Sequence, residues 1–309
     1  MPIKLILDTD IGSDADDALA LAFALRHPDI DLRAVTTVSG DAVRRGHIAK
    51  KLLHLAGRDD IEVAAGDSSE YRHGGRNAWF GHEGEGLLDP GETFELSQRD
   101  AATLIIEETK RDPDIHIATI GMQTNIAEAV ARDPDLPKRV RCLAVMGGVF
   151  APLRFLGVAL EPSVDHNLMV DPSSAVRALN AGFRTTYVPC DVTFGAWLER
   201  KHYDRLLAGD ALTRALAQQL DVWSKIVRRR AGDRMPADYV ALLHDPLTVA
   251  CLVDRRFVTA TTLPVTVAIS HANPRTFIDP AYGQPAEVIT SVDAPAFADF
   301  WTATVCAPR

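Results

Sequence analysis

Short apolar runs alternate with stretches of helical spacing along most of the chain, and this alternation limits the folds open to it. The apolar runs are rich in Val, Ile and Leu, are too short for helices and mostly lack strict alternation, which favours strands covered on both faces. They span residues 4–10, 32–40, 61–67, 115–122, 140–148, 185–192 and 263–270. Helical spacing is found at 17–26, 43–56, 99–110, 125–131, 172–180 and 206–227. We therefore predict an α/β protein: a single large domain, residues 1–309, with a mainly parallel, doubly wound, Rossmann-like sheet flanked by helices.

Charge and hydropathy exclude several classes of partner. The formal net charge of −9 argues against nucleic acid and against an anionic membrane surface. No apolar run approaches the roughly 18 residues of a membrane span, and the N-terminus lacks a secretory signal. The four cysteines are far apart without metal-site spacing, which predicts reduced thiols in a cytoplasmic protein. A small molecule or a metal ion is the expected partner.

Polar residues stand where the predicted strands end. These positions are 8–10, 39–41, 66–67, 122–125, 146–148 and 190–191. Open α/β sheets bind ligands beyond the carboxyl ends of their strands, so these residues are expected to converge at one edge of the sheet.

Five aspartates crowd the first of these positions, at Asp8, Asp10, Asp14, Asp16 and Asp17. Repelling carboxylates raise the free energy of a fold unless a cation compensates them. Oxygen ligands alone suit Ca²⁺ or Mg²⁺ rather than zinc. The alternative is that these acids cap the following helix, a role that one or two of them would satisfy.

Two further motifs carry candidate chemistry. HDP, residues 244–246, offers His244 as a general acid and Asp245 as a metal ligand, although a His-Asp pair before a helix also serves as a cap. DHNLMVDP, residues 165–172, offers Asp165 and Asn167 for adjacent sugar hydroxyls, or is an ordinary loop with a proline in the first helical turn.

Taken in order, the motifs resemble those of the nucleoside hydrolases, the inosine-uridine-preferring N-ribohydrolase family. DTDIGSDADDA at 8–18 is similar to the longer form of the family's N-terminal signature. The later motifs are TTVSGD at 36–41, GMQTNIAEA at 121–129, VMGG at 145–148, DHNLMVDP and HDP. Each motif is weak, but the ordered set covers about four-fifths of the chain and is specific.

The resemblance implies a calcium site and a catalytic base. Asp10, Asp17, Asp245 and the main-chain carbonyl of Thr124 would hold Ca²⁺. Asp10 would also act as general base toward the attacking water, and His244 would lie near the leaving base.

The resemblance also implies the substrate contacts. Asp16 and Asn167 would bind the ribose hydroxyls, with Asp165 near the far side of the sugar. His82 and Met146 would border the pocket. The chain would assemble as a homodimer or homotetramer.

The expected activity is calcium-dependent hydrolysis of the N-glycosidic bond of ribonucleosides. Cleavage passes through a ribosyl cation, which fixed carboxylates stabilise. One alternative is a non-catalytic, calcium-dependent nucleoside or ribose binder. Another is a Mg²⁺-dependent phosphatase, because DTD resembles the nucleophile motif of haloacid-dehalogenase-like enzymes, although Ile11 stands where that motif has Thr or Val.

The chain departs from the family pattern in four places. Asp41 replaces an Asn beside the site, and Asp165 replaces a Glu. No Asn matches the one expected in the loop after VMGG. Two extra residues in the N-terminal loop leave open whether Asp14 or Asp16 faces the ribose.

Aromatic residues outside the motifs have two interpretations. Trp79 and Phe80 lie in a long glycine-rich loop, where they would stack on a nucleobase or anchor the loop by packing.

Overall fold

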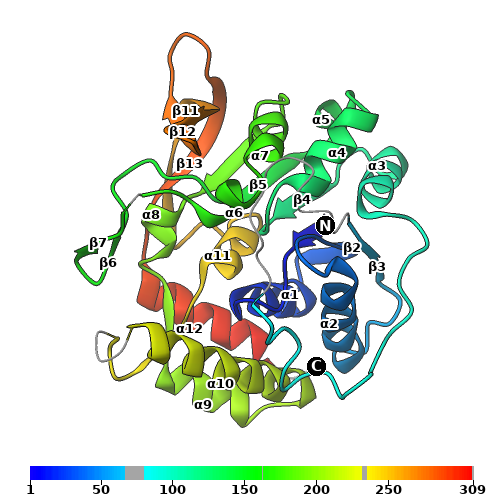
Figure 1. Ribbon diagram of the computed structural model, residues 1–309. Coiled ribbons are helices and arrows are strands. Elements are labelled where there is room, and N and C mark those ends of the chain that lie inside the picture. Colours follow the sequence, from blue (N-terminus) through cyan, green and yellow to red (C-terminus); the bar gives the residue numbers. More distant parts are fainter. Residues whose placement is uncertain (67–79, 162, 232–234, 308–309) are drawn as a thin grey trace.

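A nine-stranded sheet runs through the middle of the molecule in the computed structural model, which describes residues 1–66, 80–161, 163–231 and 235–307 (Figure 1). The strand order is β12-β11-β13-β8-β5-β4-β1-β2-β3, and the run from β13 to β3 is parallel throughout. The strands of this sheet are β1 (Ile3–Thr9), β2 (Ile30–Thr37), β3 (Glu62–Ala65), β4 (His116–Thr119), β5 (Cys142–Met146), β8 (Thr185–Val188), β11 (Val258–Ser270), β12 (Asn273–Ile278) and β13 (Gln284–Val292). Two small sheets pair β6 (Arg154–Phe155) with β7 (Val158–Ala159) and β9 (Trp197–Glu199) with β10 (Tyr239–Leu242). The predicted mainly parallel α/β architecture is confirmed.

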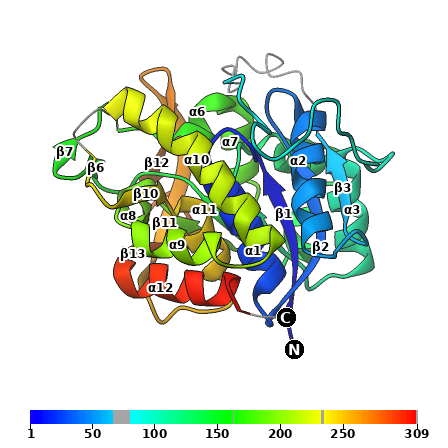
Figure 2. The same ribbon diagram turned by 90° about the horizontal axis from the view of Figure 1, so that it is seen from below.

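Helices cover both faces of this sheet. On one face lie α1 (Asp16–Arg26), α2 (Ala42–Leu55), α11 (His244–Ala250) and α12 (Ala294–Val305), with α9 (Arg200–Leu207) and α10 (Ala211–Ala231) forming an outer layer (Figures 1 and 2). On the other lie α3 (Ala101–Arg111), α4 (Thr124–Arg132) and α7 (Pro172–Leu179). The short helices are α5 (Leu136–Arg139), α6 (His166–Val170) and α8 (Cys190–Thr193). Among the described residues, no helix combines the length and apolar character that crossing a bilayer requires.

Strand β1 contributes to the core on both faces of the sheet. Leu5 and Leu7 pack into the cluster shared with α1 and α11, and Ile6 packs into the cluster shared with α3 and α4. Successive side chains of a strand point to opposite faces, so a strand covered on both sides is apolar at every position. This explains the unbroken apolar run that precedes the acidic cluster.

Two of the predicted elements are wrong in extent. The helix predicted over 206–227 is two helices, because α9 ends at Leu207 and α10 begins at Ala211. Asp210 caps the second helix by accepting a hydrogen bond from the Thr213 amide at 3.1 Å. The strand predicted over 263–270 belongs to the longer β11, which pairs antiparallel with both β12 and β13.

The carboxylate of Asp8 joins three neighbouring elements to β1. It accepts hydrogen bonds from Thr36 on β2 at 2.7 Å, Thr119 on β4 at 3.2 Å and the Asn125 amide on α4 at 2.7 Å. Asp8 is fully buried, and burial raises its pKa to about 6. The Asn125 amide also donates to the Thr37 carbonyl at 3.1 Å, which links α4 to the end of β2.

We expect Asp8→Ala to lower the free energy of unfolding by about 3 kcal/mol, because three buried donors lose their acceptor. Asp8→Asn keeps the shape and one acceptor oxygen and is expected to lose less. Urea denaturation followed by circular dichroism measures both. A loss below about 1 kcal/mol for the alanine variant would show that this carboxylate does not hold the strand ends together.

Candidate active site

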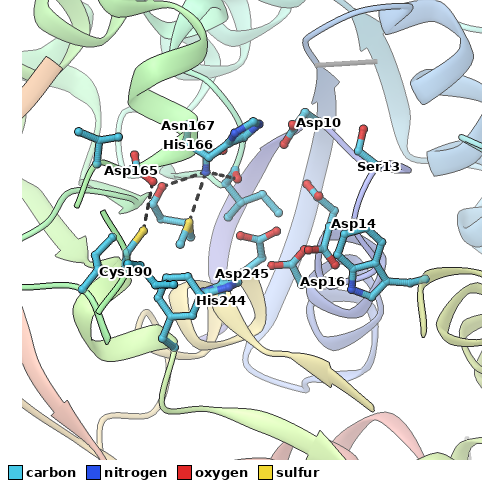
Figure 3. Close-up of a pocket in the computed structure, with 18 of the residues that line it drawn as sticks. Asp10, Ser13, Asp14, Asp16, Asp165, His166, Asn167, Cys190, His244 and Asp245 are labelled. Atoms are coloured by element: carbon cyan, nitrogen blue, oxygen red, sulfur yellow. Dashed lines mark hydrogen bonds between the residues drawn. The ribbon is translucent and has the colours of Figure 1, made fainter. Parts of the chain in front are cut away.

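A cavity of about 370 Å³ opens beyond the carboxyl ends of the parallel strands. It lies where β1 has β4 on one side and β2 on the other, the switch point at which open α/β sheets bind ligands. Eight of the predicted site residues line it: Asp10, Asp16, Asp17, Met146, Asp165, Asn167, His244 and Asp245. Figure 3 shows the aspartates of the N-terminal loop on one side of the cavity, and Asp165 with Cys190 on the other.

Three carboxylates meet in one wall of this cavity. Oxygens of Asp16, Asp17 and Asp245 lie within 4.8 Å of one another, and each side chain is at most 5% exposed. The first two open α1, whereas Asp245 is in the first turn of α11, which packs against α1. Residues more than two hundred positions apart are therefore brought together by the contact between two helices.

Among the described residues, these three acids have no ion-pair partner, and the charge of Arg45 offsets only part of the repulsion at Asp17. Burial raises the pKa of all three, and repulsion from neighbouring aspartates raises it further. In the described part of the chain, no Lys or Arg forms an ion pair with any of them. Buried oxygens so close together fit a hard divalent cation such as Ca²⁺ or Mg²⁺.

Arg45 is the cation that stabilises the N-terminal loop itself. Its guanidinium donates to the main-chain carbonyls of Ser39, Asp10 and Ile11 and to the hydroxyl of Ser13. The arginine thus fixes the backbone of the loop that carries the aspartates. Thr9 supports one of them directly, because its hydroxyl donates to the Asp17 carboxylate.

Asp10 directly follows β1 and lies against Gly121, which follows the neighbouring strand β4. A Cβ at Gly121 would lie 2.8 Å from both the amide nitrogen and the carboxylate of Asp10, closer than side-chain atoms approach. The missing side chain at Gly121 therefore allows Asp10 to reach the cavity. Asp10 contributes repulsion to Asp17 and Asp245, although the group within 4.8 Å does not include it.

Asn167 lines the cavity, and its side-chain amide is bonded to the cavity wall. Its amide nitrogen donates to the main-chain carbonyls of Ile120 at 2.8 Å and Met146 at 3.2 Å, as Figure 3 shows in part. Because those bonds orient the side chain, Oδ1 is the atom left to accept a hydrogen bond from a ligand. It has no partner among the described residues.

Asp165 is held in the cavity wall. Its carboxylate accepts from the Leu168 amide at 2.9 Å, which caps α6, and from the Cys190 thiol at 3.2 Å. Gly147 leaves room for it, because a Cβ there would lie 2.8 Å from Oδ2. Burial raises the pKa of Asp165.

His244 begins α11 and lines the cavity beside Asp245. Its Nδ1 lies 2.6 Å from the Thr193 hydroxyl, and the Phe194 ring meets the imidazole edge-on at a centroid distance of 4.9 Å. Burial lowers the pKa of His244 to about 4, so the ring is neutral at neutral pH.

Both candidates for the ribose-facing acid line the cavity, but they differ in their contacts. Asp16 belongs to the three-carboxylate group. Asp14 lies outside that group and accepts a hydrogen bond from the Ala15 amide at 2.5 Å. Asp14 therefore bonds the residue that precedes α1, but α1 has no side-chain cap, so the capping alternative does not account for this acid.

Three predicted site residues do not line the cavity. Asp41 is exposed and caps α2 through the Arg44 amide at 2.8 Å. The ring of His82 stacks on Trp223, and its Nε2 lies 2.7 Å from the Ser13 carbonyl. Thr124 begins α4 and donates its hydroxyl to Asp171 at 2.7 Å.

Aromatic and sulfur groups complete the walls. Phe80 and Trp223 line the cavity, whereas Trp79 lies outside the described residues. Cys190 and Phe194 also line it and were not predicted as site residues. The position of Cys190 at the end of a predicted strand was the one available signal for them.

Comparisons with known proteins agree with this geometry. Residues 5–299 match the family model described as inosine-uridine preferring nucleoside hydrolase. The chain is 30% identical to the inosine-uridine preferring nucleoside hydrolase of Leishmania major, over 97% of this chain and 96% of the relative. It is 29% identical to a pyrimidine-specific ribonucleoside hydrolase of Salmonella newport, over 82% and 80% of the two chains.

Solved structures support the same assignment. A plant nucleoside hydrolase superposes with a TM-score of 0.83 at 26% identity, covering all of both chains. With a family model spanning most of its length, the chain belongs to the inosine-uridine preferring nucleoside hydrolase family.

Proposed function

We propose that this protein hydrolyses the N-glycosidic bond of ribonucleosides to release a free base and ribose, in a reaction that depends on Ca²⁺. The observation that carries the proposal is the buried group of Asp16, Asp17 and Asp245, which shares one cavity with Asp10 and Asn167. Family membership and the names of the relatives support the same reaction.

The proposed metal ligands are carboxylates. Asp17 and Asp245 would hold the ion with Asp10 and the Thr124 carbonyl, and Asp16 is close enough to contribute an oxygen or to bind a ribose hydroxyl. Calcium binds mixed sets of carboxylate and carbonyl oxygens. When bound, it would orient the sugar diol and the attacking water together and lower the pKa of that water.

The chain's own residues perform the remaining steps. Asp10 accepts a proton from the water while the water oxygen attacks C1′ of the ribose. The C1′–N bond breaks, and its electron pair passes to the base. Positive charge develops on the ribosyl group, and the surrounding carboxylates stabilise it. Asn167 accepts a hydrogen bond from a ribose hydroxyl through Oδ1.

The leaving base needs a hydrogen-bond donor as it gains electron density. His244 is the proposed donor, because it lines the cavity and its neutral imidazole keeps one N–H. Phe80 and Trp223 offer apolar faces for the base. The relatives differ in the bases they are named for, so no single base is assigned to this chain.

The alternatives differ in what they require. A non-catalytic binder would keep the metal and sugar ligands but needs no leaving-group donor, so His244 favours the enzyme.

We further propose a cytoplasmic homodimer or homotetramer. Light scattering on the purified protein measures its assembly, and a monomer would contradict that part of the proposal.

Calcium is expected to raise the thermal unfolding temperature, because the ion binds only the folded state. At a free concentration of 100 times its dissociation constant, the ion adds about 2.7 kcal/mol of stability. Asp245→Asn should abolish this increment and the binding heat seen in calorimetry. Asp41→Asn is the matched control, since it changes an exposed acid that still caps α2, and it should bind calcium as the wild type does. An equal loss in both variants, or no binding to the wild type, would refute the site.

The reaction is tested with inosine, uridine, cytidine and adenosine, each with calcium or with a chelator, followed by an assay for free ribose. We expect ribose from at least one nucleoside with calcium and a large loss after chelation. No ribose from any of them in the presence of calcium would exclude the hydrolase.

Asp10→Asn is expected to lower kcat by at least about a hundredfold, the range lost with a general base. The far-ultraviolet circular dichroism spectrum and the unfolding temperature should stay close to those of the wild type, because Asn fits the same space beside Gly121. Activity within about tenfold of the wild type would contradict the proposed role of Asp10.

A further inference from the structure

We infer that Thr193 is a positioning residue that sets which nitrogen of His244 presents a proton to the leaving base. The inference rests on the proposed nucleoside hydrolysis and assigns a further residue to that site. Its basis is the 2.6 Å contact between the Thr193 hydroxyl and Nδ1 of His244.

The two side chains are brought together by a rigid arrangement. Thr193 ends α8, and His244 begins α11. Between these helices, β9 pairs with β10, and the Leu243 amide donates to the Ala196 carbonyl at 2.9 Å. The backbone just after Thr193 is thus bonded to the backbone just before His244.

The Thr193 hydroxyl can donate its proton to two acceptors. One is Nδ1 of His244 at 2.6 Å, and the other is the Cys190 carbonyl at 3.5 Å, the outer limit of a hydrogen bond. Either atom can donate across the 2.6 Å contact, depending on the imidazole tautomer. We assign the hydroxyl as the donor to Nδ1, because its other acceptor, the Cys190 carbonyl, lies at the limit of a hydrogen bond. A neutral imidazole that accepts at Nδ1 carries its own proton at Nε2.

The packing around His244 limits other orientations. Thr193 is fully buried, and Phe194 stands edge-on to the imidazole at an interplanar angle of 88°. With Nδ1 engaged in the wall, Nε2 is the nitrogen left to face a ligand in the cavity. Figure 3 shows His244 on the cavity wall beside Asp245.

This arrangement supplies a donor where the reaction needs one. As the C1′–N bond breaks, electron density grows on the acceptor atoms of the base, and a hydrogen bond from Nε2–H strengthens in the transition state. Without the Thr193 hydroxyl, the imidazole would also populate the tautomer that presents a lone pair, which repels the same atoms.

The experiment compares two leaving groups in Thr193→Val, which keeps the shape but removes the hydroxyl. The substrates are a nucleoside that the wild type hydrolyses and 4-nitrophenyl β-D-ribofuranoside, whose phenolate departs without protonation. For the nucleoside we expect kcat to fall about tenfold, the upper range for one neutral hydrogen bond, with little change in KM. On the aryl riboside kcat should fall less than about threefold.

Three further variants make the result specific to the hydroxyl. Thr193→Ser restores it and should recover most of the nucleoside rate. In the His244→Ala background, Thr193→Val should have little further effect, because the two residues act as a unit. Thr302→Val is the matched control: Thr302 is equally buried, and its hydroxyl bonds the Ala298 carbonyl within α12. It should leave the ratio of the two rates unchanged.

The rate ratio for the two substrates does not depend on how much of a variant is folded, so partial misfolding cannot imitate the effect. An unchanged ratio in Thr193→Val, or an equal effect in the His244→Ala background, would overturn the inference. A wild type that cleaves no nucleoside would instead refute the proposed function, so the two failures are distinguishable.

Discussion

The hydrogen bonds of one buried carboxylate hold the strand ends on which this site is built. Asp8 connects β1 to β2, to β4 and to the first turn of α4, at the edge where the cavity opens. Asp10 is two residues further on, and Gly121 is two residues beyond Thr119. Because the donors that surround Asp8 fix the spacing of these segments, the close approach between Asp10 and Gly121 depends on it.

Local sequence patterns, the apolar runs and the helical spacing, explain most of the fold. Apolar runs without alternation predicted strands covered on both faces, and β1 contributes to the core on each side as expected. Periodicity failed where a polar residue caps a helix within a continuous apolar pattern. Residues 206–227 keep helical spacing across Gly209 and Asp210, so periodicity alone did not separate α9 from α10.

The candidate site was predictable to the extent that motifs lie at strand ends. Asp10, Asn167 and Asp245 were predicted from their motifs and share the cavity. Asp41 also follows a strand, but its side chain caps α2 instead, and the two roles look alike in sequence. Thr193 carries no local signal, because its importance arises from a contact with a residue 51 positions away.

The N-terminal loop is bonded to neighbouring segments through Ser13. Ser13 accepts from Arg45 on α2, donates to Glu83 at 3.1 Å, and offers its carbonyl to His82, which stacks on Trp223 of α10. A change in the loop that moves Ser13 would disturb all of these contacts at once. Loop length and the residues at positions 45, 82 and 83 are therefore expected to change together among relatives. The spacing of the aspartates in this loop is thus expected to vary with the contacts that connect His82 and Trp223 to the loop.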